Sequence, residues 1–272
     1  MGAFAGRTMG SSTTANPIQG TFSWNAQKGV MGLRFDGKSY NVASFRGATL
    51  HCDLFRYGGR PHGKTHKFSS SYGSFPQGKT KIKVWKSNGK DSELHYQGDY
   101  AALQKSPIAG CKFESIIVIA VGQCIIQEVD ENYNTIGEKE NLVNGKPIIC
   151  QMKIHGKWGM EAWNEELVEP FGIKDTRDAD GLLITYPGKT KTYQSAQGTH
   201  YAPFFQISEI KDDEAGKAFA VKCKGLYDVV QEWLLQHWQS PDVDQLAAKH
   251  YEEDVTVQPV KEAIVDDDDL PF

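Results

Sequence analysis

The chain has 272 residues, of which 39% are hydrophobic, and its formal net charge at pH 7 is −4. This length suits one large domain or one and a half, and the apolar content is sufficient for a hydrophobic core. Five cysteines without close pairing favour a reducing compartment over a disulfide framework. The most apolar stretch, residues 116–126, is interrupted by Gly122 and Gln123 and cannot span a membrane, so we expect a soluble protein of the cytoplasm.

Residues 1–19 are expected to form a disordered arm, because they are rich in Gly, Ser and Thr and lack the apolar run of a signal peptide. Residues 20–222 form the expected core domain. Short apolar or alternating runs in it are separated by Gly, Pro and Asn clusters, a pattern typical of β-strands joined by turns. We expect strands at residues 21–24, 30–35, 49–57, 81–86, 113–128, 147–154, 181–186 and 204–210.

The first 90 residues hold most of the excess positive charge. They contain 14 Lys and Arg and only two acids, Asp36 and Asp53, which gives a net charge of +12. Residues 251–272 contain eight acids and one lysine, a net charge of −7. The negative charge of the whole chain therefore comes from this segment, and the rest of the chain is net positive. A strongly basic half favours binding to a polyanion such as nucleic acid.

Aromatic residues are interleaved with these cations between residues 55 and 86. Rings stack on exposed bases while cations follow the phosphates, which is how single strands are held without reading sequence. We expect stacking by Phe55, Tyr57, Phe68, Tyr72, Phe75 and Trp85. We expect phosphate contacts from Arg56, Arg60, Lys64, Lys67, Lys79, Lys81, Lys83 and Lys86. For any single ring, burial in the core is the more frequent outcome, so the prediction rests on the cluster and not on one of its members.

Period-two alternation assigns side chains to faces in two of the expected strands. In residues 81–85, the apolar side chains point to the core and Trp85 shares the opposite face with two lysines. In residues 50–57, the same rule leaves Phe55 and Tyr57 pointing away from the core. These three rings are therefore expected to be accessible to bases.

Residues 113–128 are apolar at odd and even positions, which predicts a central strand buried on both faces and bent at Gly122. Many short strands separated by long loops predict a mostly β fold. Because one face of an OB-type five-stranded barrel binds oligonucleotides, the expected ligand favours that barrel, decorated with long loops and followed by C-terminal helices and a disordered acidic tail.

Residues 223–253 are expected to be helical. Apolar side chains recur at three- and four-residue spacing over residues 225–239, which predicts an amphipathic helix. Ser240 and Pro241 offer a cap and a first-turn proline for a second helix. We expect both helices to pack on the barrel, and self-association through their tryptophans is the alternative.

The sequence contains no Walker loop, no G-x-S-x-G elbow and no H-E-x-x-H pair, so we expect no catalytic site. His62 and His66, with Cys52 upstream, have a spacing compatible with zinc, but no C-x-x-C completes a tetrahedral set, and we expect no cofactor. The acids most favourable for a metal-dependent nuclease are Glu161, Glu165, Glu166, Asp175, Asp178 and Asp180. Those around residue 178 have the composition of a solvated turn.

Residues 254–272 are expected to form a flexible acidic tail, because a run of like charges stays extended and the penultimate proline disfavours a final helical turn. The tail presents two apolar side chains to a partner with a basic rim and an apolar pocket. Its tip consists of Asp266, Asp267, Asp268, Asp269, Leu270, Pro271 and Phe272. This tip resembles the acidic C-terminal end of bacterial single-stranded DNA-binding proteins and of several phage counterparts, with leucine where the bacterial family usually has isoleucine.

The resemblance implies a phage or viral single-stranded DNA-binding protein, located in the host cytoplasm, that coats and protects single strands in DNA replication, recombination and repair. It also implies that the tip recruits replication or recombination proteins, and that the tail occupies the DNA groove when DNA is absent. The resemblance covers only about seven residues. The core is about twice the length of a minimal OB domain, and no long Gly/Gln/Pro-rich linker precedes the tip, which favours a monomer or dimer over a tetramer.

Two other classes of function are compatible with the same features. A recombination mediator or helicase loader would act mainly through protein interaction and bind DNA poorly by itself. A strand-annealing protein or a metal-dependent nuclease would use the basic surface for a reaction on strands. The DNA affinity of the isolated chain distinguishes the first class from a single-stranded DNA-binding protein. Strand pairing or magnesium-dependent cleavage distinguishes the second.

Overall fold

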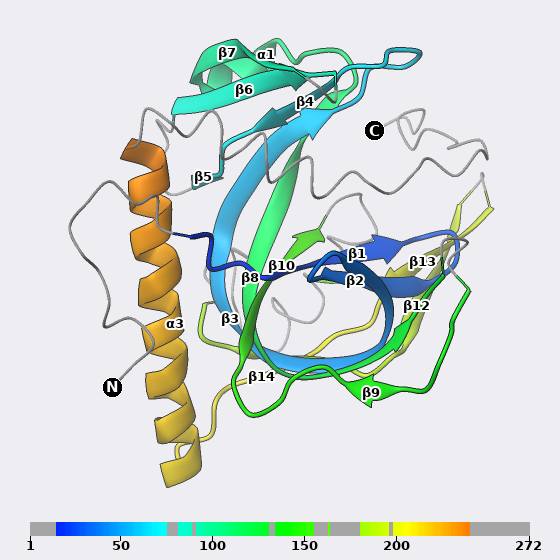
Figure 1. The fold of residues 1–272 in the computed structure, drawn as a ribbon, viewed down its shortest axis with the longest axis vertical. Coiled ribbons are helices and arrows are strands. Elements are labelled where there is room, and N and C mark those ends of the chain that lie inside the picture. The colour runs from blue at the N-terminus through cyan, green and yellow to red at the C-terminus, as the bar shows by residue number, and fades with distance from the viewer. Residues whose placement is uncertain are drawn as a thin grey trace.

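The structure is a computed structural model that describes residues 15–74, 81–88, 91–130, 134–154, 163, 180–195 and 198–239. The fold is mostly β, which confirms the predicted class. Five strands form a closed ring: β1 (Gly20–Asn25), β2 (Val30–Phe35), β3 (Lys38–Gly59), β8 (Cys111–Glu128) and β10 (Ile148–Ile154). Successive members of this set pair antiparallel, and the parallel pair of β10 with β1 closes the ring (Figure 1).

A two-residue turn, Asp36-Gly37, joins β2 to β3. Both residues have positive φ, 48° and 74°, which is the backbone of a type I′ hairpin turn. Asp-Gly is one of the sequences that this turn favours, since glycine accepts positive φ without strain and aspartate tolerates it. The turn fixes the register in which β2 pairs with β3.

Strands β3 and β8 extend beyond the ring, where the same sheet continues on β3. Their ends, Leu54–Gly59 and Cys111–Ile116, remain paired with each other (Figure 1). We call this region the distal sheet; besides those ends it contains β4 (Lys67–Ser70), β5 (Gly73–Ser74), β6 (Lys81–Ser87) and β7 (Ser92–Asp99). The short helix α1 (Tyr100–Lys105) follows β7 and buries Leu103 in the core of this region.

Strand β8 is buried on both faces, as its apolar pattern predicts. Ile117, Ile119 and Val121 belong to the core inside the ring, and the alternate residues between them belong to the core beneath helix α3. In the ladder with β3, Val121 and Gln123 have partners but Gly122 has none, and this is the glycine at which the sequence predicts a bend.

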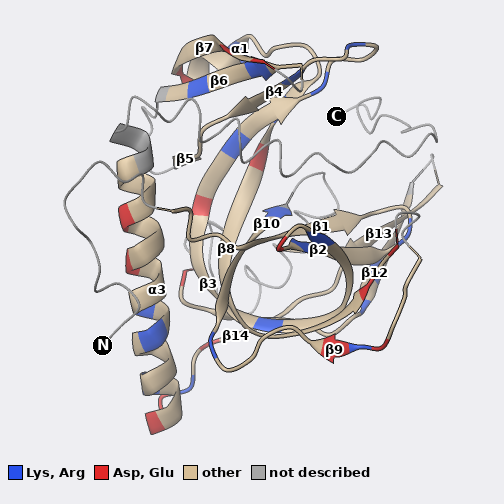
Figure 2. Ribbon diagram, in the orientation of Figure 1, with Lys and Arg blue, Asp and Glu red and all other residues tan. Residues whose placement is uncertain are grey.

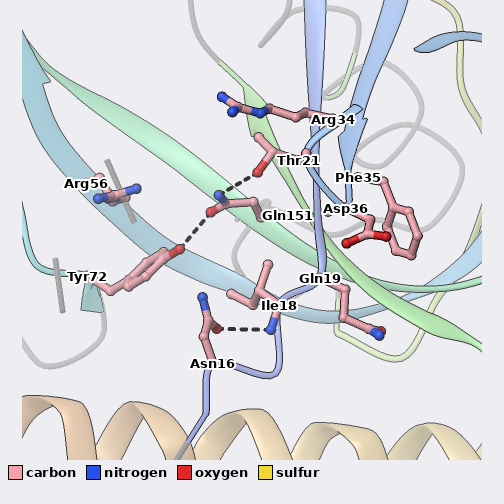
Figure 3. A pocket seen from close by; sticks show the side chains of 12 residues that line it. Asn16, Ile18, Gln19, Thr21, Arg34, Phe35, Asp36, Arg56, Tyr72 and Gln151 are labelled. Atoms are coloured by element: carbon pink, nitrogen blue, oxygen red, sulfur yellow. Dashed lines mark hydrogen bonds between the residues drawn. The ribbon is translucent and has the colours of Figure 1, made fainter. Parts of the chain in front are cut away.

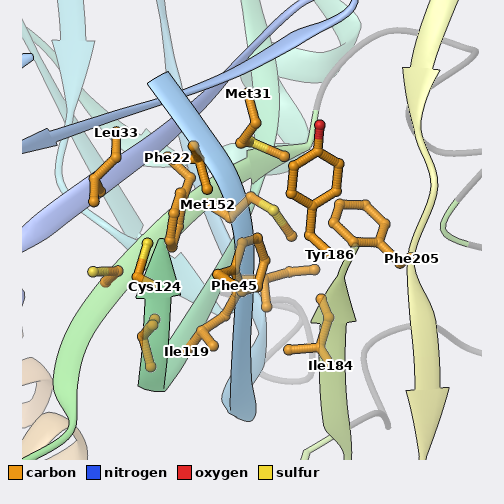
Figure 4. Close-up of a cluster of buried hydrophobic side chains, with 14 of the residues drawn as sticks. Phe22, Met31, Leu33, Phe45, Ile119, Cys124, Met152, Ile184, Tyr186 and Phe205 are labelled. Carbon is orange, nitrogen blue, oxygen red and sulfur yellow. The ribbon is translucent and has the colours of Figure 1, made fainter. Parts of the chain in front are cut away.

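The core inside the ring is built from stacked and edge-on aromatic rings (Figure 4). Phe22 stacks on Phe45 with ring centroids 4.6 Å apart, and Tyr186 and Phe205 close the cluster from β11 (Leu183–Tyr186) and the segment before β14 (Gln206–Ser208). The remaining strands are β9 (Glu140–Asn141), which pairs with β8, and β12 (Thr190–Ser195) and β13 (Gly198–Pro203), which form a separate two-stranded sheet.

Helix α3 (Glu214–Gln239) lies along the outside of β3. It ends where the sequence predicts but begins earlier than residue 225, because Asp213 caps it: its carboxylate accepts a hydrogen bond from the Gly216 amide at 2.7 Å. Val230, Trp233 and Leu234 pack on the sheet, which confirms the predicted apolar stripe. Within the described part of the chain, no helix has the length and apolar character needed to cross a membrane.

Candidate nucleic-acid interface

Five of the six aromatic side chains predicted to face bases lie in the hydrophobic core. Each of them is at most 6% exposed: Phe55, Tyr57, Phe68, Tyr72 and Trp85. Phe75 lies outside the described residues. The expectation that these five rings are accessible is therefore wrong, because a ring packed in a core has no face open to a base.

Phe55 and Tyr57 are buried because β3 has a second layer on the face that alternation assigned to solvent. Both rings contact Phe113 of β8, with centroids 5.6 and 4.6 Å away. Tyr100 of α1 covers Phe55 from another side at 5.4 Å. Alternation identifies two faces of a strand, but it cannot show that both are covered.

Trp85 is buried although alternation places it on the face opposite Val84, so both faces of β6 are covered here, and the two side chains are 2% and 0% exposed. The ladder with β7 is irregular at this point, since Val84 pairs with Tyr96 and Trp85 with Leu94, but the extra residue lies in β7 and leaves the alternation of β6 unbroken. Lys83, in contrast, keeps the partly exposed position that alternation predicts.

The predicted phosphate contacts differ in exposure. Arg60 and Lys64 are exposed in the loop after β3, and Lys83 and Lys86 are half-buried on β6. Arg56 and Lys67 are buried, at 5% and 7% exposure, and therefore do not form an open phosphate track. Lys79 and the side chain of Lys81 lie outside the described part of the chain.

One acid of β7 neutralises part of the basic surface of β6. Glu93 of β7 stands opposite Lys86, and their side chains form an ion pair at 3.1 Å. The charge count over residues 1–90 does not include this acid, since β7 begins at Ser92. Residues 54–90, however, contain nine Lys and Arg and no acid, and Figure 2 shows cations on β4, β6 and the end of β3.

A pocket of about 400 Å³ opens between the ring and the distal sheet (Figure 3). Its lining comes from the segment before β1, from β1 and β10, from the β2–β3 turn, and from Arg56 and Tyr72. Two arginines, Arg34 and Arg56, and one aspartate, Asp36, are the charged residues of this lining. The pocket is thus net positive and lies in the size range of small-molecule sites.

Three pocket side chains form a row across adjacent strands. Thr21 of β1 is paired with Arg34 of β2 on one side and with Gln151 of β10 on the other. The next residue pairs, around Phe22, point into the ring core. Because successive side chains of a strand alternate between faces, the row of three lies on the outer face of the ring, where the pocket opens.

Hydrogen bonds hold the wall of the pocket in place. The Tyr72 hydroxyl donates to Gln151 Oε1 at 2.8 Å, and Gln151 Nε2 donates to Thr21 Oγ1 at 2.9 Å. The Arg56 guanidinium carbon lies 5.0 Å from the centre of the Tyr72 ring, within cation–π range, and Nε of the same arginine donates to the Ser70 carbonyl at 3.4 Å. Arg56 is therefore oriented by its neighbours at the edge of the pocket.

Sequence reasoning missed Thr21, Arg34 and Gln151 as site residues. The parallel pair of β1 with β10 brings Thr21 to Gln151 across 130 positions of sequence. One local signal was present: Gln151 is a polar residue in the middle of an apolar strand, and it is 5% exposed. A buried amide requires hydrogen-bonding partners, so such a residue marks a polar site.

The considered zinc and nuclease residues do not assemble into a site in the described part of the chain, where no group of three or more His, Cys, Asp or Glu side chains could hold a metal ion. The buried Cys52 has a pKa well above its ordinary value, because burial and Asp180 oppose the thiolate. The Asp180 carboxylate accepts a hydrogen bond from the Cys52 amide at 2.8 Å. The other nuclease candidates, the second helix and the acidic tail, Asp266–Phe272 included, lie outside the described residues.

No protein-family model, no curated protein and no solved structure matches the chain. Function is therefore inferred from its own residues. The features available are a basic segment without acids, exposed cations in the loop after β3, and a net positive pocket beside the ring.

Proposed function

We propose that this chain is a non-enzymatic single-stranded DNA-binding protein that coats and protects single strands in replication, recombination and repair. One observation carries the proposal: the acid-free segment 54–90 builds the end of β3, β4, β5 and β6, so its positive charge gathers at one end of the molecule (Figure 2). An excess of positive charge at one end, here partly neutralised by Glu93 of β7, is the electrostatic basis for binding a nucleic-acid backbone.

Phosphate contacts, not a row of stacked bases, provide most of the affinity in this proposal. With five of the six rings buried, the proposal assigns phosphate contacts first to the exposed cations Arg60 and Lys64. Binding should then depend weakly on sequence and steeply on salt. A preference for single strands is expected because an unpaired nucleotide can enter a pocket that a stacked base pair cannot.

The proposal includes an OB-type scaffold. The closed sheet of five strands supports it, since an OB-fold is a five-stranded barrel that binds oligonucleotides on one face. The ring strands follow one another in chain order and close through a parallel pair, whereas an OB-fold is a Greek key. The likeness is therefore one of strand number and closure.

The acidic tail is proposed to have two roles. In the absence of DNA it competes for the basic surface, and once displaced by a single strand its tip recruits replication or recombination proteins. The opposite charges of residues 1–90 and 251–272, +12 and −7, support the first role, and the Leu-Pro-Phe ending supports the second. The proposed location is the cytoplasm, of a host cell if the protein is viral.

The test is fluorescence anisotropy with the purified full chain and a labelled oligonucleotide, single-stranded or in a duplex of equal length, at several salt concentrations. The proposal expects tight binding to the single strand, weaker binding to the duplex and a steep loss of affinity with salt. Equal affinity for both forms, or no binding at low salt, would overturn it. Magnesium-dependent cleavage or pairing of complementary strands in the same samples would instead indicate a nuclease or an annealing protein.

A chain that ends at residue 265 tests the tail. If the tip competes with DNA, its removal raises affinity at low salt, where charge interactions are least screened, and has little effect at high salt. An affinity that is unchanged at low salt would show that the tail does not occupy the DNA surface.

A further inference from the structure

The hydrogen bonds of the pocket have a direction. The Tyr72 hydroxyl donates to Gln151, and Gln151 donates to Thr21, so the Thr21 oxygen accepts and its own hydrogen is the next donor. No described residue accepts a hydrogen bond from the Thr21 hydroxyl, and the Thr21 side chain is part of the pocket wall. A chain of hydrogen bonds polarises its members, so this end is a good donor to an incoming acceptor oxygen.

The same wall carries two guanidinium groups. Arg34 stands beside Thr21 in the strand register, and Arg56 lines the pocket from β3. Guanidinium and hydroxyl donors together match the oxygens of a phosphate, which accept several hydrogen bonds at once. The donors thus indicate a phosphate-bearing ligand.

The size of the pocket and its opposite wall indicate more than a bare phosphate. About 400 Å³ exceeds the space that one phosphate needs, and Phe35 lies across the pocket from Arg56 and Tyr72 in Figure 3. Phe35 packs against the ring core and is only partly buried, and its exposed part belongs to the pocket lining at the end of β2. An aromatic side chain at this place offers a nucleobase an apolar contact.

We propose that the pocket binds one nucleotide, with its phosphate at Arg34, Arg56 and Thr21 and its base against Phe35. The nucleotide comes from a bound single strand, a source that rests on the proposed function. The pocket then holds one unpaired nucleotide, while the exposed cations of the loop after β3 contact phosphates elsewhere on the strand.

The experiment titrates the full chain with thymidine 5′-monophosphate, thymidine and inorganic phosphate by isothermal calorimetry. Saturable binding is expected for the monophosphate, with weaker binding of inorganic phosphate and of thymidine, because each lacks one half of the contacts. Arg34→Gln and Thr21→Val should each weaken binding of the monophosphate by about tenfold or more.

Two matched controls remove the same groups elsewhere. Arg46→Gln removes an equal charge from an exposed position of β3, and Thr185→Val removes a hydroxyl from β11. Both controls should bind the monophosphate like the wild type. Circular dichroism and thermal unfolding verify that all four variants are folded; Thr21→Val keeps the shape of the side chain and so tests the site even if Arg34→Gln does not fold.

The outcomes separate this inference from the proposed function. If the chain binds single strands but shows no saturable binding of the monophosphate, and Arg34→Gln behaves like Arg46→Gln, the nucleotide pocket is wrong and the proposed function stands. If the monophosphate binds and the oligonucleotide does not, the pocket is a nucleotide site and the proposed function is wrong.

Discussion

Tyr72 packs edge to face against Trp233 of helix α3, with ring centroids 5.7 Å apart and ring planes at 75°. The hydroxyl of the same tyrosine donates to Gln151 on the pocket wall, and its ring lies under the Arg56 guanidinium. A single side chain therefore joins α3, the arginine and the hydrogen-bonded wall. The position of α3 and the geometry of the pocket are coupled through Tyr72.

Tyr72→Phe should destabilise the protein. The substitution keeps the ring contacts with Trp233 and Arg56 but removes the donor to Gln151 Oε1, and an unsatisfied buried acceptor costs about 1–3 kcal/mol. Urea unfolding followed by circular dichroism measures the change. Tyr96→Phe is the control, because its hydroxyl donates to the Asp99 carbonyl at a site exposed to water. Equal losses of stability in both variants would show that the hydrogen bond to Gln151 has no special role.

Two glycines of α3 should respond to alanine in opposite directions. A Cβ at Gly225 would meet no atom within 4 Å, so Gly225→Ala should raise the free energy of unfolding by about 0.5–1 kcal/mol through helix propensity. A Cβ at Gly216 would clash with the Lys211 carbonyl oxygen, so Gly216→Ala should lower it. Thermal unfolding of both variants gives the sign. A destabilised Gly225→Ala variant would contradict the position of Gly225 on the exposed side of α3.

Sequence patterns predicted those elements that depend on local periodicity. The apolar run at residues 113–128 corresponds to β8, and the stripe around Trp233 corresponds to the packed face of α3. The prediction was wrong for Trp85, since alternation along β6 cannot show that both of its faces are covered at this position. It was wrong for Phe55 because the layer that covers this ring comes from residues more than forty positions away, around Tyr100 and Phe113.

The pocket could not be predicted in the same way. Its wall requires the parallel pair of β1 with β10 and the extension of β3 beyond the ring. Neither feature leaves a local signal in the sequence. In the sequence, nothing distinguishes Thr21 and Arg34 from other polar residues of β-strands. Their role as donors follows from their register with each other and with Gln151.

Stability should fall in mild acid because of His51. This side chain stacks on Tyr227 at 4.2 Å, and burial lowers its pKa below the ordinary value of 6.5, although Asp53, 4.0 Å away, partly offsets the effect. The unfolded chain then binds the proton more readily than the folded chain. His51 therefore leaves the free energy of unfolding unchanged above about pH 6.5 and lowers it as the pH falls below that value.

Urea unfolding at about pH 7.5 and about pH 5.5 tests this expectation against His51→Gln, which cannot titrate in this range. The wild type should lose more free energy of unfolding than the variant between the two pH values. Because the proton would sit between β3 and α3, the difference reports on docking of the helix. Identical losses in the two proteins would mean that other groups account for the acid sensitivity.

The loop after β3 should contribute measurably to the salt dependence of DNA binding. Arg60 and Lys64 are exposed there, in a segment without acids, so each is placed to contact a phosphate. Replacing both with glutamine should reduce the slope of log affinity against log salt by roughly 1.4, about 0.7 for each lost phosphate contact with a single strand. Anisotropy titrations over a range of salt concentrations give this slope.

The matched control is Lys139→Gln with Lys146→Gln, which removes the same charge from exposed positions on either side of β9, near Glu138 and Glu140. This pair should leave the slope unchanged, because phosphates avoid a surface that carries acids. If both double variants reduced the slope equally, affinity would follow the net charge of the chain, and the end of β3 would not be the DNA-binding surface. A reduction confined to the Arg60 and Lys64 variant would place the strand at the loop after β3, within the acid-free segment.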